Sequence, residues 1–599
     1  MGLFLLLVSE QVFGSYQDIK NLSQSQTWHG LLDFKDDDLE IKDQSNYLSN
    51  IDNFSPYEEL IKTVDEYKKF LAGNSSFFCI FPSRAYFINK HFKNLGDLDL
   101  KKCKEFQKWS NDGKIDSISL LYVTGYLKNP ASFFGHTLIK FNSSTNDKNN
   151  SYLLENTLNY GAETGNDAAL PYVIKGLIGG YNAGLQSEKF FRLSAQYQEF
   201  QMRDIYEYRL SLTQHQQNLI VSYTFEMNRN RYDYYFLSDN CAYRMNRILG
   251  VGLNKEPMPK TPWKAPIDLL IGVNDLQIVK DIYYHPSQTT RTLSSIEALN
   301  ENEKNLYKVI LKNPNEISKY KDQVSNNIKI ALIETLNYKK LKQFKENNVE
   351  QLKQIDENRK NILLSIDKNK EFTRNKIINT DVPHKINRPT LLSYAFTNNK
   401  RFDNGHSVRL RGANFEFLDI DNTRLGNSEF VFLSPTLMLY ENKILLEEFT
   451  LFKVLSLNDL KTNIPDEINF SWGIDVSRKN ISDLCYPCNS NQLKGSLGKG
   501  LYVNDNMSIY NLININAHQS RENSGNISGS LELGIIYKYK KIKFHIKHEN
   551  INFDKTDIFD TEENSINIKF NIDYGYDFSI KYNKNEFNKA YSINLNKYF

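Results

Sequence analysis

The sequence predicts a multidomain α+β protein that ends in an antiparallel transmembrane β-barrel of about 12 strands. Three observations predict this fold class. The chain has 599 residues, 40% of them hydrophobic, and a chain of this length exceeds what one hydrophobic core holds. Its hydrophobic residues recur with a helical period in the early part of the chain and alternate with polar residues in the last third. It also contains 36 Tyr and 37 Phe but only 4 Trp, an aromatic excess that a membrane-facing sheet would explain.

Changes in this pattern divide the chain into five segments. Residues 1–15 contain the short apolar run 3–8 without a basic start, which we interpret as a weak secretory signal peptide, with an ordinary cytosolic N-terminus as the alternative. No other apolar run approaches the length of about eighteen residues that a transmembrane helix needs. The remaining segments are a helical N-terminal region at 16–112, an α+β domain at 113–280, a helical segment and linker at 281–388, and the barrel at 389–599.

The barrel is predicted from strict alternation along successive strands. Ile566, Ile568 and Phe570, for example, are separated by single polar residues. Successive side chains of a strand point to opposite faces, so each strand has one apolar and one polar face. A soluble β-sandwich also alternates and is the alternative. We favour the barrel because its apolar face is rich in Tyr and Phe, and because the chain ends on Phe599, which resembles the assembly signal of bacterial outer-membrane barrels. The predicted location is therefore the outer membrane.

Charge and motifs exclude several classes of function. With 74 basic and 71 acidic residues the net charge is +3, which gives no reason to expect a nucleic-acid partner. Dinucleotide-binding, phosphate-loop, zinc-protease and nucleophile-elbow motifs are absent from the sequence. We therefore expect no cofactor and no metal.

Two stretches could carry thiol chemistry: residues 129–137 (NPASFFGHT) and residues 238–244 (SDNCAYR). The first places His136 at the start of a predicted strand, and the second places Cys241 at the N-terminus of a helix predicted over 242–249. A helix N-terminus and a nearby imidazole both lower the pKa of a thiol. Such a cysteine could attack an acyl carbonyl, with N–H groups at the helix start holding the oxyanion. From the residues alone, an inert buried cysteine and a histidine with only a structural role are the commoner situation.

The region from Ser117 to Pro259 resembles the Lnb N-terminal periplasmic domain family. The resemblance rests on several blocks that occur in the same order as in the family: residues 129–137, 159–162 (NYGA), 176–181 (GLIGGY), 203–208 (RDIYEY) and 234–244 (YYFLSDNCAYR). It implies a circularly permuted papain-like fold related to NlpC-like hydrolases, in which the histidine strand precedes the cysteine helix, as it does here.

The resemblance also implies a role for each site residue. Cys241 would be the nucleophile and His136 the general base and then acid. Asn159, from the neighbouring strand, is the candidate that orients His136. Asn156, on the other face of that strand, is the alternative, and Asn159 could also be only a turn residue. For the cleft, the residues expected to line it, allow close backbone approach or cap the helix are Tyr122, Ser132, Gly135 and Asn240.

The other four cysteines are interpreted as structural. Cys79 and Cys103 flank a helical segment and would pair in an oxidising periplasm. Cys485 and Cys488 have the spacing of redox or metal motifs, but they fall in a loop between barrel strands, so a loop-closing disulfide is the preferred interpretation. Two such bridges would leave Cys241 as the free thiol.

Taken with the predicted barrel, the resemblance implies an outer-membrane-anchored periplasmic thiol acyltransferase or hydrolase that acts on lipid or lipoprotein acyl groups. Known family members transfer acyl chains during lipoprotein maturation, but this chain offers a barrel anchor and no inner-membrane helix. Two alternatives stay open: an NlpC-like peptidoglycan endopeptidase, and a non-enzymatic outer-membrane barrel or scaffold protein. The expected partners are outer-membrane lipid and a lipid acyl or peptidoglycan substrate.

Overall fold

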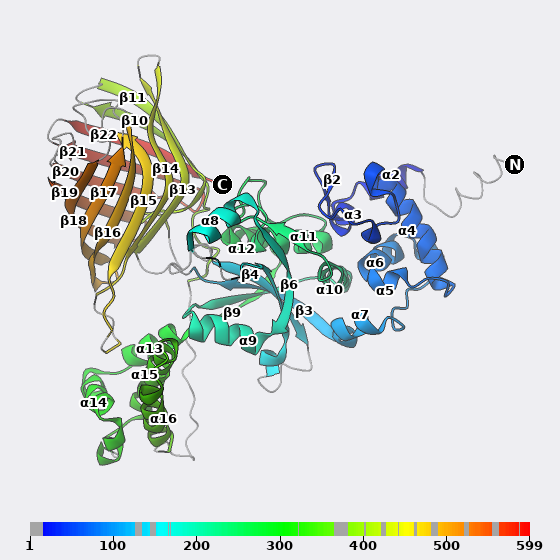
Figure 1. The fold of residues 1–599 in the computed structure, drawn as a ribbon, viewed down its shortest axis with the longest axis horizontal. Coiled ribbons are helices and arrows are strands. Elements are labelled where there is room, and N and C mark those ends of the chain that lie inside the picture. The colour runs from blue at the N-terminus through cyan, green and yellow to red at the C-terminus, as the bar shows by residue number, and fades with distance from the viewer. Residues whose placement is uncertain are drawn as a thin grey trace. The chain divides into compact units, whose positions relative to one another are not determined.

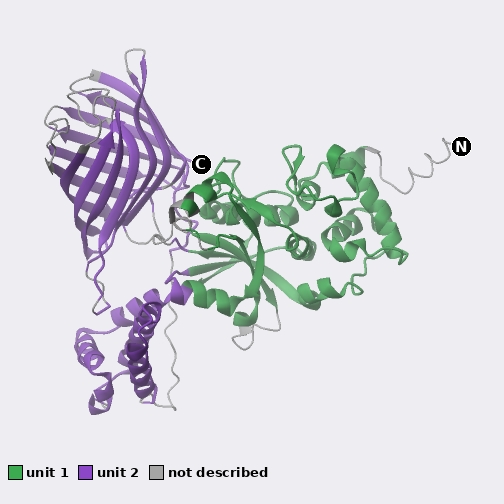
Figure 2. Ribbon diagram, viewed as in Figure 1, with its two compact units in different colours: residues 1–123, 135–197, 205–285 green, residues 124–134, 198–204, 286–599 purple. Residues whose placement is uncertain are grey.

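The structure is a computed structural model that describes most of the chain. The described residues are 16–125, 135–143, 151–165, 167, 169–320, 323–364, 381–399, 403–420, 427–440, 443–460, 464–465, 467–480, 489–519, 526–553, 562–585 and 588–599. The expected signal peptide, Ser132, Cys485 and Cys488 lie outside these residues. The chain forms two compact units, the first made of residues 1–123, 135–197 and 205–285 and the second of 124–134, 198–204 and 286–599 (Figure 2).

The first unit begins with a helical region, as predicted. Its elements are α2 (Tyr16–Ser23), α3 (Gln26–Leu31), the short strands β1 (Phe34–Lys35) and β2 (Asp38–Leu39), α4 (Pro56–Leu71), α5 (Phe77–Ile80), α6 (Pro82–His91) and α7 (Lys104–Trp109). Aromatic side chains fill its core, with Trp28, Tyr67 and Phe78 each fully buried. The disulfide between Cys79 and Cys103 joins α5 to the start of α7, as expected from the sequence.

The rest of the first unit is an antiparallel sheet covered by helices on both faces (Figure 1). Its strands are β3 (Ile115–Val123), β4 (His136–Ser143), β5 (Asn156–Ala162), β6 (Tyr181–Lys189), β7 (Ile205–Leu210), β8 (Tyr232–Tyr234) and β9 (Val279–His285), in the order β8-β6-β5-β4-β3-β7-β9. Its helices are α8 (Ala169–Ile178), α9 (Phe190–Ser194), α10 (Gln214–Met227), α11 (Cys241–Leu253) and α12 (Pro266–Asp275). The helices α10 and α11 pack against β3, β4 and β5, whereas Phe190 and Leu193 of α9 pack with Leu121 and Leu138 on the other face.

The second unit begins with the predicted helical segment. It comprises α13 (Gln288–Glu297), α14 (Glu301–Lys312), α15 (Asn326–Lys345) and α16 (Val349–Leu364). Buried residues of these helices form one core, and Ile464, from the loop that follows a barrel strand, is buried in the same core. Glu467 of that loop accepts a hydrogen bond from Lys342 of α15 at 2.8 Å. Among the described helices of the whole chain, none is long and apolar enough to cross a bilayer.

The predicted barrel is present and closed. Its strands are β10 (Leu391–Asn399), β11 (Asp403–Arg411), β13 (Asn427–Tyr440), β14 (Lys443–Leu457), β15 (Ser471–Asn480), β16 (Asn489–Asn504), β17 (Met507–Gln519), β18 (Asn526–Tyr539), β19 (Ile542–Phe553), β20 (Glu562–Asn571), β21 (Tyr576–Asn585) and β22 (Lys589–Tyr598), with the short β12 (Ala413–Phe415) beside β13. Each strand pairs antiparallel with the next, β10 pairs with β22, and β11 pairs with β13, so the sheet has no free edge.

The alternation of the strands sorts side chains between lipid and lumen, as the sequence predicts. On β22, Tyr591, Ile593 and Leu595 are 53%, 53% and 60% exposed on the outer face, whereas Asn594 and Asn596, which alternate with them, are buried inside. β10 begins and β22 ends at the same end of the barrel. The chain that leads into β10 comes from the α+β domain and the helical segment, which are predicted to lie in the periplasm. We call this end the periplasmic end.

Candidate active site

The sequence around Cys241 folds so that the thiol stands at the start of a helix. Cys241 is the first residue of α11, and Asn240 is its N-cap. The Asn240 side chain accepts hydrogen bonds from the N–H groups of Ala242 at 3.0 Å and Tyr243 at 3.2 Å. Asn240 therefore caps the helix, as expected from the sequence. Two of the N–H groups at the helix start are thereby already used, whereas the N–H of Cys241 takes no part in the cap.

The amide nitrogen of Asn240 holds this start in place. It donates to the carbonyl oxygens of Phe236 at 2.9 Å and Lys264 at 2.7 Å. Phe236 in turn donates its N–H to the carbonyl of Gly176 at the end of α8, at 2.8 Å. A Cβ at Gly176 would lie 2.3 Å from the Phe236 ring, so only glycine allows this approach. Two of the sequence blocks quoted for the family resemblance thus meet directly beside Cys241.

The surroundings of the Cys241 sulfur favour its ionised form. Burial, which leaves the residue 4% exposed, raises the pKa of the thiol. The charge of His136 and hydrogen bonds from His136 and Thr137 act in the opposite direction and outweigh burial. The pKa of Cys241 therefore lies below its ordinary value, which is typical of reactive cysteines.

His136 is oriented by a polar residue on the next strand. It is the first residue of β4, and its Nε2 lies 2.6 Å from Oδ1 of Asn159 on β5. The Tyr197 ring lies beside the imidazole, with ring centroids 6.0 Å apart. Asn156, the alternative orienting residue, pairs with Phe141 toward the far end of β4 from His136. The structure therefore brings Cys241, His136 and Asn159 together and leaves Asn156 apart.

Gly135 and Tyr122 shape the backbone just before His136. Gly135 has φ +84°, in the left-handed region that favours glycine, and a Cβ there would lie 2.6 Å from Cε2 of Tyr122. Tyr122 pairs with Thr137 across β3 and β4 and is 7% exposed. The requirement for glycine expected at position 135 thus comes from both its backbone angle and the Tyr122 ring.

A buried network of charge lies along α11 beyond the thiol. Arg244 Nη1 donates to Glu40 Oε2 at 2.7 Å, and the Tyr243 hydroxyl donates to Glu40 Oε1. The Arg244 guanidinium also lies 3.8 Å from the centre of the Tyr232 ring. Burial raises the pKa of Glu40, but the charges of Arg244 and Arg247 outweigh it, so that the pKa lies below the ordinary value. The N-terminal helical region thus contributes a carboxylate that is ion-paired to the cysteine helix.

Sequence reasoning missed two residues of this region. Thr137 contributes to lowering the pKa of the thiol, and its position directly after His136 in the quoted motif was the available signal. Glu40 lies some 200 positions before Arg244, in a segment without any motif, and nothing in the sequence pointed to it.

Fold and site together define the class: an outer-membrane β-barrel protein that also carries an α+β domain with a cysteine–histidine pair. Residues 105–269 match the family model of the Lnb N-terminal periplasmic domain, which confirms the resemblance and includes Cys241, His136 and Asn159. Residues 20–91 match a second family model, described as a domain of unknown function, DUF7843. The chain is therefore located in the outer membrane with its α+β domain in the periplasm.

Solved structures similar to part of the chain include porins and an outer membrane channel. The KdgM porin in complex with disordered oligogalacturonate is 13% identical, with 35% of this chain and 99% of that chain covered and a TM-score of 0.23. The NanC porin is 9% identical, with 35% and 99% covered and a TM-score of 0.24. An outer membrane channel from Pseudomonas putida F1 is 9% identical, with 36% and 96% covered and a TM-score of 0.22. Likenesses at this level carry no inference about function. Among curated proteins, none matches the chain.

Proposed function

We propose that the protein is a thiol-dependent acyltransferase or hydrolase that acts on lipid or lipoprotein acyl groups at the periplasmic side of the outer membrane. One observation carries the proposal. The Cys241 thiol, at the start of α11, has a pKa lowered by His136, and the His136 ring also lies 2.6 Å from Oδ1 of Asn159. Nucleophile, base and orienting amide therefore stand in the order that thiol acyl transfer requires.

In the proposed reaction, the Cys241 thiolate attacks the carbonyl carbon of an acyl ester. A sulfur–carbon bond forms, the ester carbon–oxygen bond breaks, and the departing alkoxide takes the proton held by His136. In the second step, an amine or a water molecule attacks the thioester and gives its proton to His136, and the thiolate is released. Asn159 keeps the imidazole in the orientation that both transfers need.

The oxyanion of each tetrahedral intermediate needs a donor at the start of α11. Ala242 and Tyr243 donate their N–H groups to Asn240. We therefore assign the N–H of Cys241 itself to the oxyanion, assisted by the positive end of the helix dipole. From the sequence we expected several N–H groups at the helix start to hold the oxyanion, and the proposal now names only that of Cys241.

A covalent probe tests the proposal. The purified full-length protein is incubated with a small acyl ester that traps thiols as thioesters, and the intact mass is measured. We expect one adduct on the wild type, none on Cys241→Ala, and a strongly reduced rate for His136→Gln. His91→Gln is the matched control, because His91 is an exposed histidine on α6 whose ring packs against Phe87. Absence of an adduct on the wild type would refute thiol catalysis.

The substrate class is decided by a second comparison with the same variants. Phospholipid vesicles and soluble muropeptides are offered separately, and product is measured by mass spectrometry. Cys241-dependent loss of an acyl chain from phospholipid supports the proposal. Cys241-dependent cleavage of the muropeptide alone would make the protein a peptidoglycan endopeptidase instead.

A further inference from the structure

A short segment of the barrel domain lies inside the lumen instead of outside the barrel. It comprises residues 416–420, between β12 and β13, and we call it the strap. Within it, Phe417, Leu418 and Asp419 are 5%, 4% and 1% exposed. A loop at the periplasmic end of a barrel would ordinarily face water. Burial of this segment therefore needs specific contacts, and they come from two sides of the barrel.

On one side, Asp419 binds residues of β11, β19, β20 and β22, which lie on both sides of the pairing between β10 and β22. Its Oδ2 accepts a hydrogen bond from Arg411 of β11 at 2.6 Å, and its Oδ1 accepts one from Lys569 of β20 at 2.5 Å. The Tyr598 hydroxyl of β22 lies 3.0 Å from the same oxygen. The carbonyl oxygen of Asp419 accepts a further hydrogen bond from Lys543 of β19.

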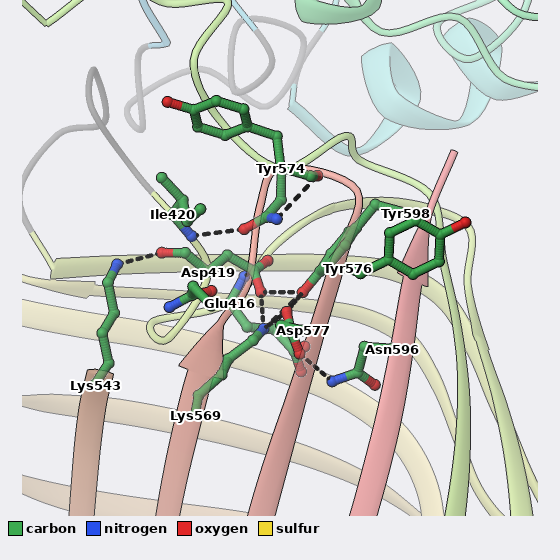
Figure 3. A network of polar contacts seen from close by, with 12 residues as sticks. Glu416, Asp419, Ile420, Lys543, Lys569, Tyr574, Tyr576, Asp577, Asn596 and Tyr598 are labelled. Carbon is green, nitrogen blue, oxygen red and sulfur yellow. Dashed lines mark hydrogen bonds and ion pairs between the residues drawn. The ribbon is translucent and has the colours of Figure 1, made fainter. Parts of the chain in front are cut away.

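The partners of Asp419 are themselves fixed, as Figure 3 shows. Lys569 donates to the Tyr598 hydroxyl at 2.6 Å and forms an ion pair with Asp577 at 3.0 Å. Asn596 donates to Asp577 at 2.5 Å. Asp419, Arg411, Lys569 and Asp577 are thus joined by ion pairs, which buried charges need. We call these contacts of Asp419 the clasp.

On the opposite side, the strap packs by hydrophobic contact. Phe417 is part of a buried cluster inside the lumen whose other members come from β14, β17 and β18: Leu455, Leu457, Tyr510, Leu512 and Ile536. Its ring also meets the His545 ring of β19 edge-on, with centroids 5.8 Å apart. The strap therefore spans from β20, β22 and β11 across to β14 and β17, near the periplasmic ends of these strands.

A cavity of about 690 Å³ fills the lumen beyond the strap. Glu416, Phe417 and Leu418 are among its lining residues, together with residues as far as Asn399 and Asn588 at the opposite rim. The strap thus lines the cavity at the periplasmic end of the lumen.

We propose that the strap seals the periplasmic mouth of the barrel, and that the Asp419 clasp holds it there. The barrel is then a closed membrane anchor rather than an open pore, and release of the clasp opens it. The strands need no help from the strap, because each is hydrogen-bonded to both neighbours around the closed sheet. This inference does not depend on the chemistry proposed for Cys241.

Single-channel recording of the full-length protein in planar lipid bilayers tests the inference. We expect the wild type to give no conductance steps, and Asp419→Ala to give discrete steps. Asp419→Asn keeps the shape of the side chain but loses its charge, and we expect it to open less often than Asp419→Ala. Asp475→Ala is the matched control, because Asp475 also lines the lumen but pairs only with Lys479 among the ion pairs of the described residues and lies outside the clasp. It should remain silent.

Folding is checked separately for each variant, by the shift in electrophoretic mobility between heated and unheated samples. If Asp419→Ala fails to fold, Asp419→Asn and Phe417→Ala decide the matter, since each weakens one attachment of the strap. Steps from the wild type as frequent as those from the variants would overturn the seal. A silent Asp419→Asn and a silent Phe417→Ala, both folded, would overturn the role of the clasp.

Discussion

Each unit of the molecule contains a buried ionic network in which a carboxylate of one segment is bound by an arginine of another. In the first unit, Glu40 of the N-terminal region binds Arg244 of the cysteine helix at 2.7 Å. In the barrel, Asp419 of the strap binds Arg411 of β11 at 2.6 Å. The chemistry of the two pairs is alike, but their surroundings differ. Glu40 binds a helix of the hydrophobic core, whereas Asp419 holds a short segment against a barrel that closes without it.

This difference teaches what each network can stabilise. Unlike a barrel strand, helix α11 is not held by backbone hydrogen bonds to a neighbouring element of the same kind. Its position depends on side-chain packing, including contacts with α3 and α10. Loss of Glu40 would leave Arg244, which is 3% exposed, without its charge partner inside that packing. Loss of Asp419 would leave the sheet hydrogen bonds intact. The network around Glu40 therefore stabilises the fold of the first unit. The network around Asp419 stabilises one state of the barrel, the state with the strap inside, and the fold of the barrel does not depend on it.

The largest expected effect is that of Glu40→Ala. Removing one partner of a buried ion pair costs about 3–5 kcal/mol, because the other charge stays buried and unpaired. We expect the urea midpoint of the first unit to fall accordingly, measured by tryptophan fluorescence of the full chain, since Trp28, Trp109 and Trp263 lie in that unit. Asp419→Ala should leave this transition unchanged. An equal effect of the two substitutions would remove the distinction between the networks.

The second-largest expected effect is that of removing the disulfide of the same N-terminal region. Cys79 and Cys103 close a loop with a sequence separation of 24. Replacing both by serine should cost about 3 kcal/mol, chiefly because the unfolded chain gains freedom. The measurement is the same urea titration, with Cys241→Ser, which removes no bridge, as the control. A loss much smaller than that of Glu40→Ala would show that charge, more than the covalent link, holds this region.

The two networks also mark the limit of what sequence could predict. The barrel was predictable because alternation is a local pattern, repeated in runs such as Tyr591, Ile593 and Leu595. His136, Asn159 and Cys241 were predictable because each lies in a short block of the family. Glu40 and Asp419 were not, since ion pairs between residues separated by 204 and 150 positions leave no periodicity in either segment. The strap itself (EFLDI) is rich in apolar residues, but five residues are too few to show a period.

A smaller effect, about 1 kcal/mol, is expected for Asn240→Ala. The substitution removes the side-chain acceptor that caps the start of α11. Asn240→Asp separates the two roles of the side chain, because a carboxylate accepts the same two hydrogen bonds from the helix but cannot donate to Phe236 and Lys264. If Asn240→Ala shifted the urea midpoint as far as Glu40→Ala, the first network would not be the main support of the cysteine helix.

The smallest effect in free energy is the ionisation of the thiol, and it tests whether the cysteine helix places Cys241 against His136. The pKa of Cys241 is lowered in the folded protein, so its ionisation stabilises the fold above the ordinary thiol pKa of about 8.5. That contribution is lost as the pH falls through the lower folded value. Alkylation of Cys241 by iodoacetamide should therefore persist below pH 8, and His136→Ala should move the profile upward, because burial alone raises the pKa. Glu40→Gln should move the pH profile of alkylation only if the ion pair between Glu40 and Arg244 also sets the position of the thiol. An unshifted profile for His136→Ala would mean that the imidazole does not act on the sulfur, and the distinction drawn between the networks would then rest on stability alone.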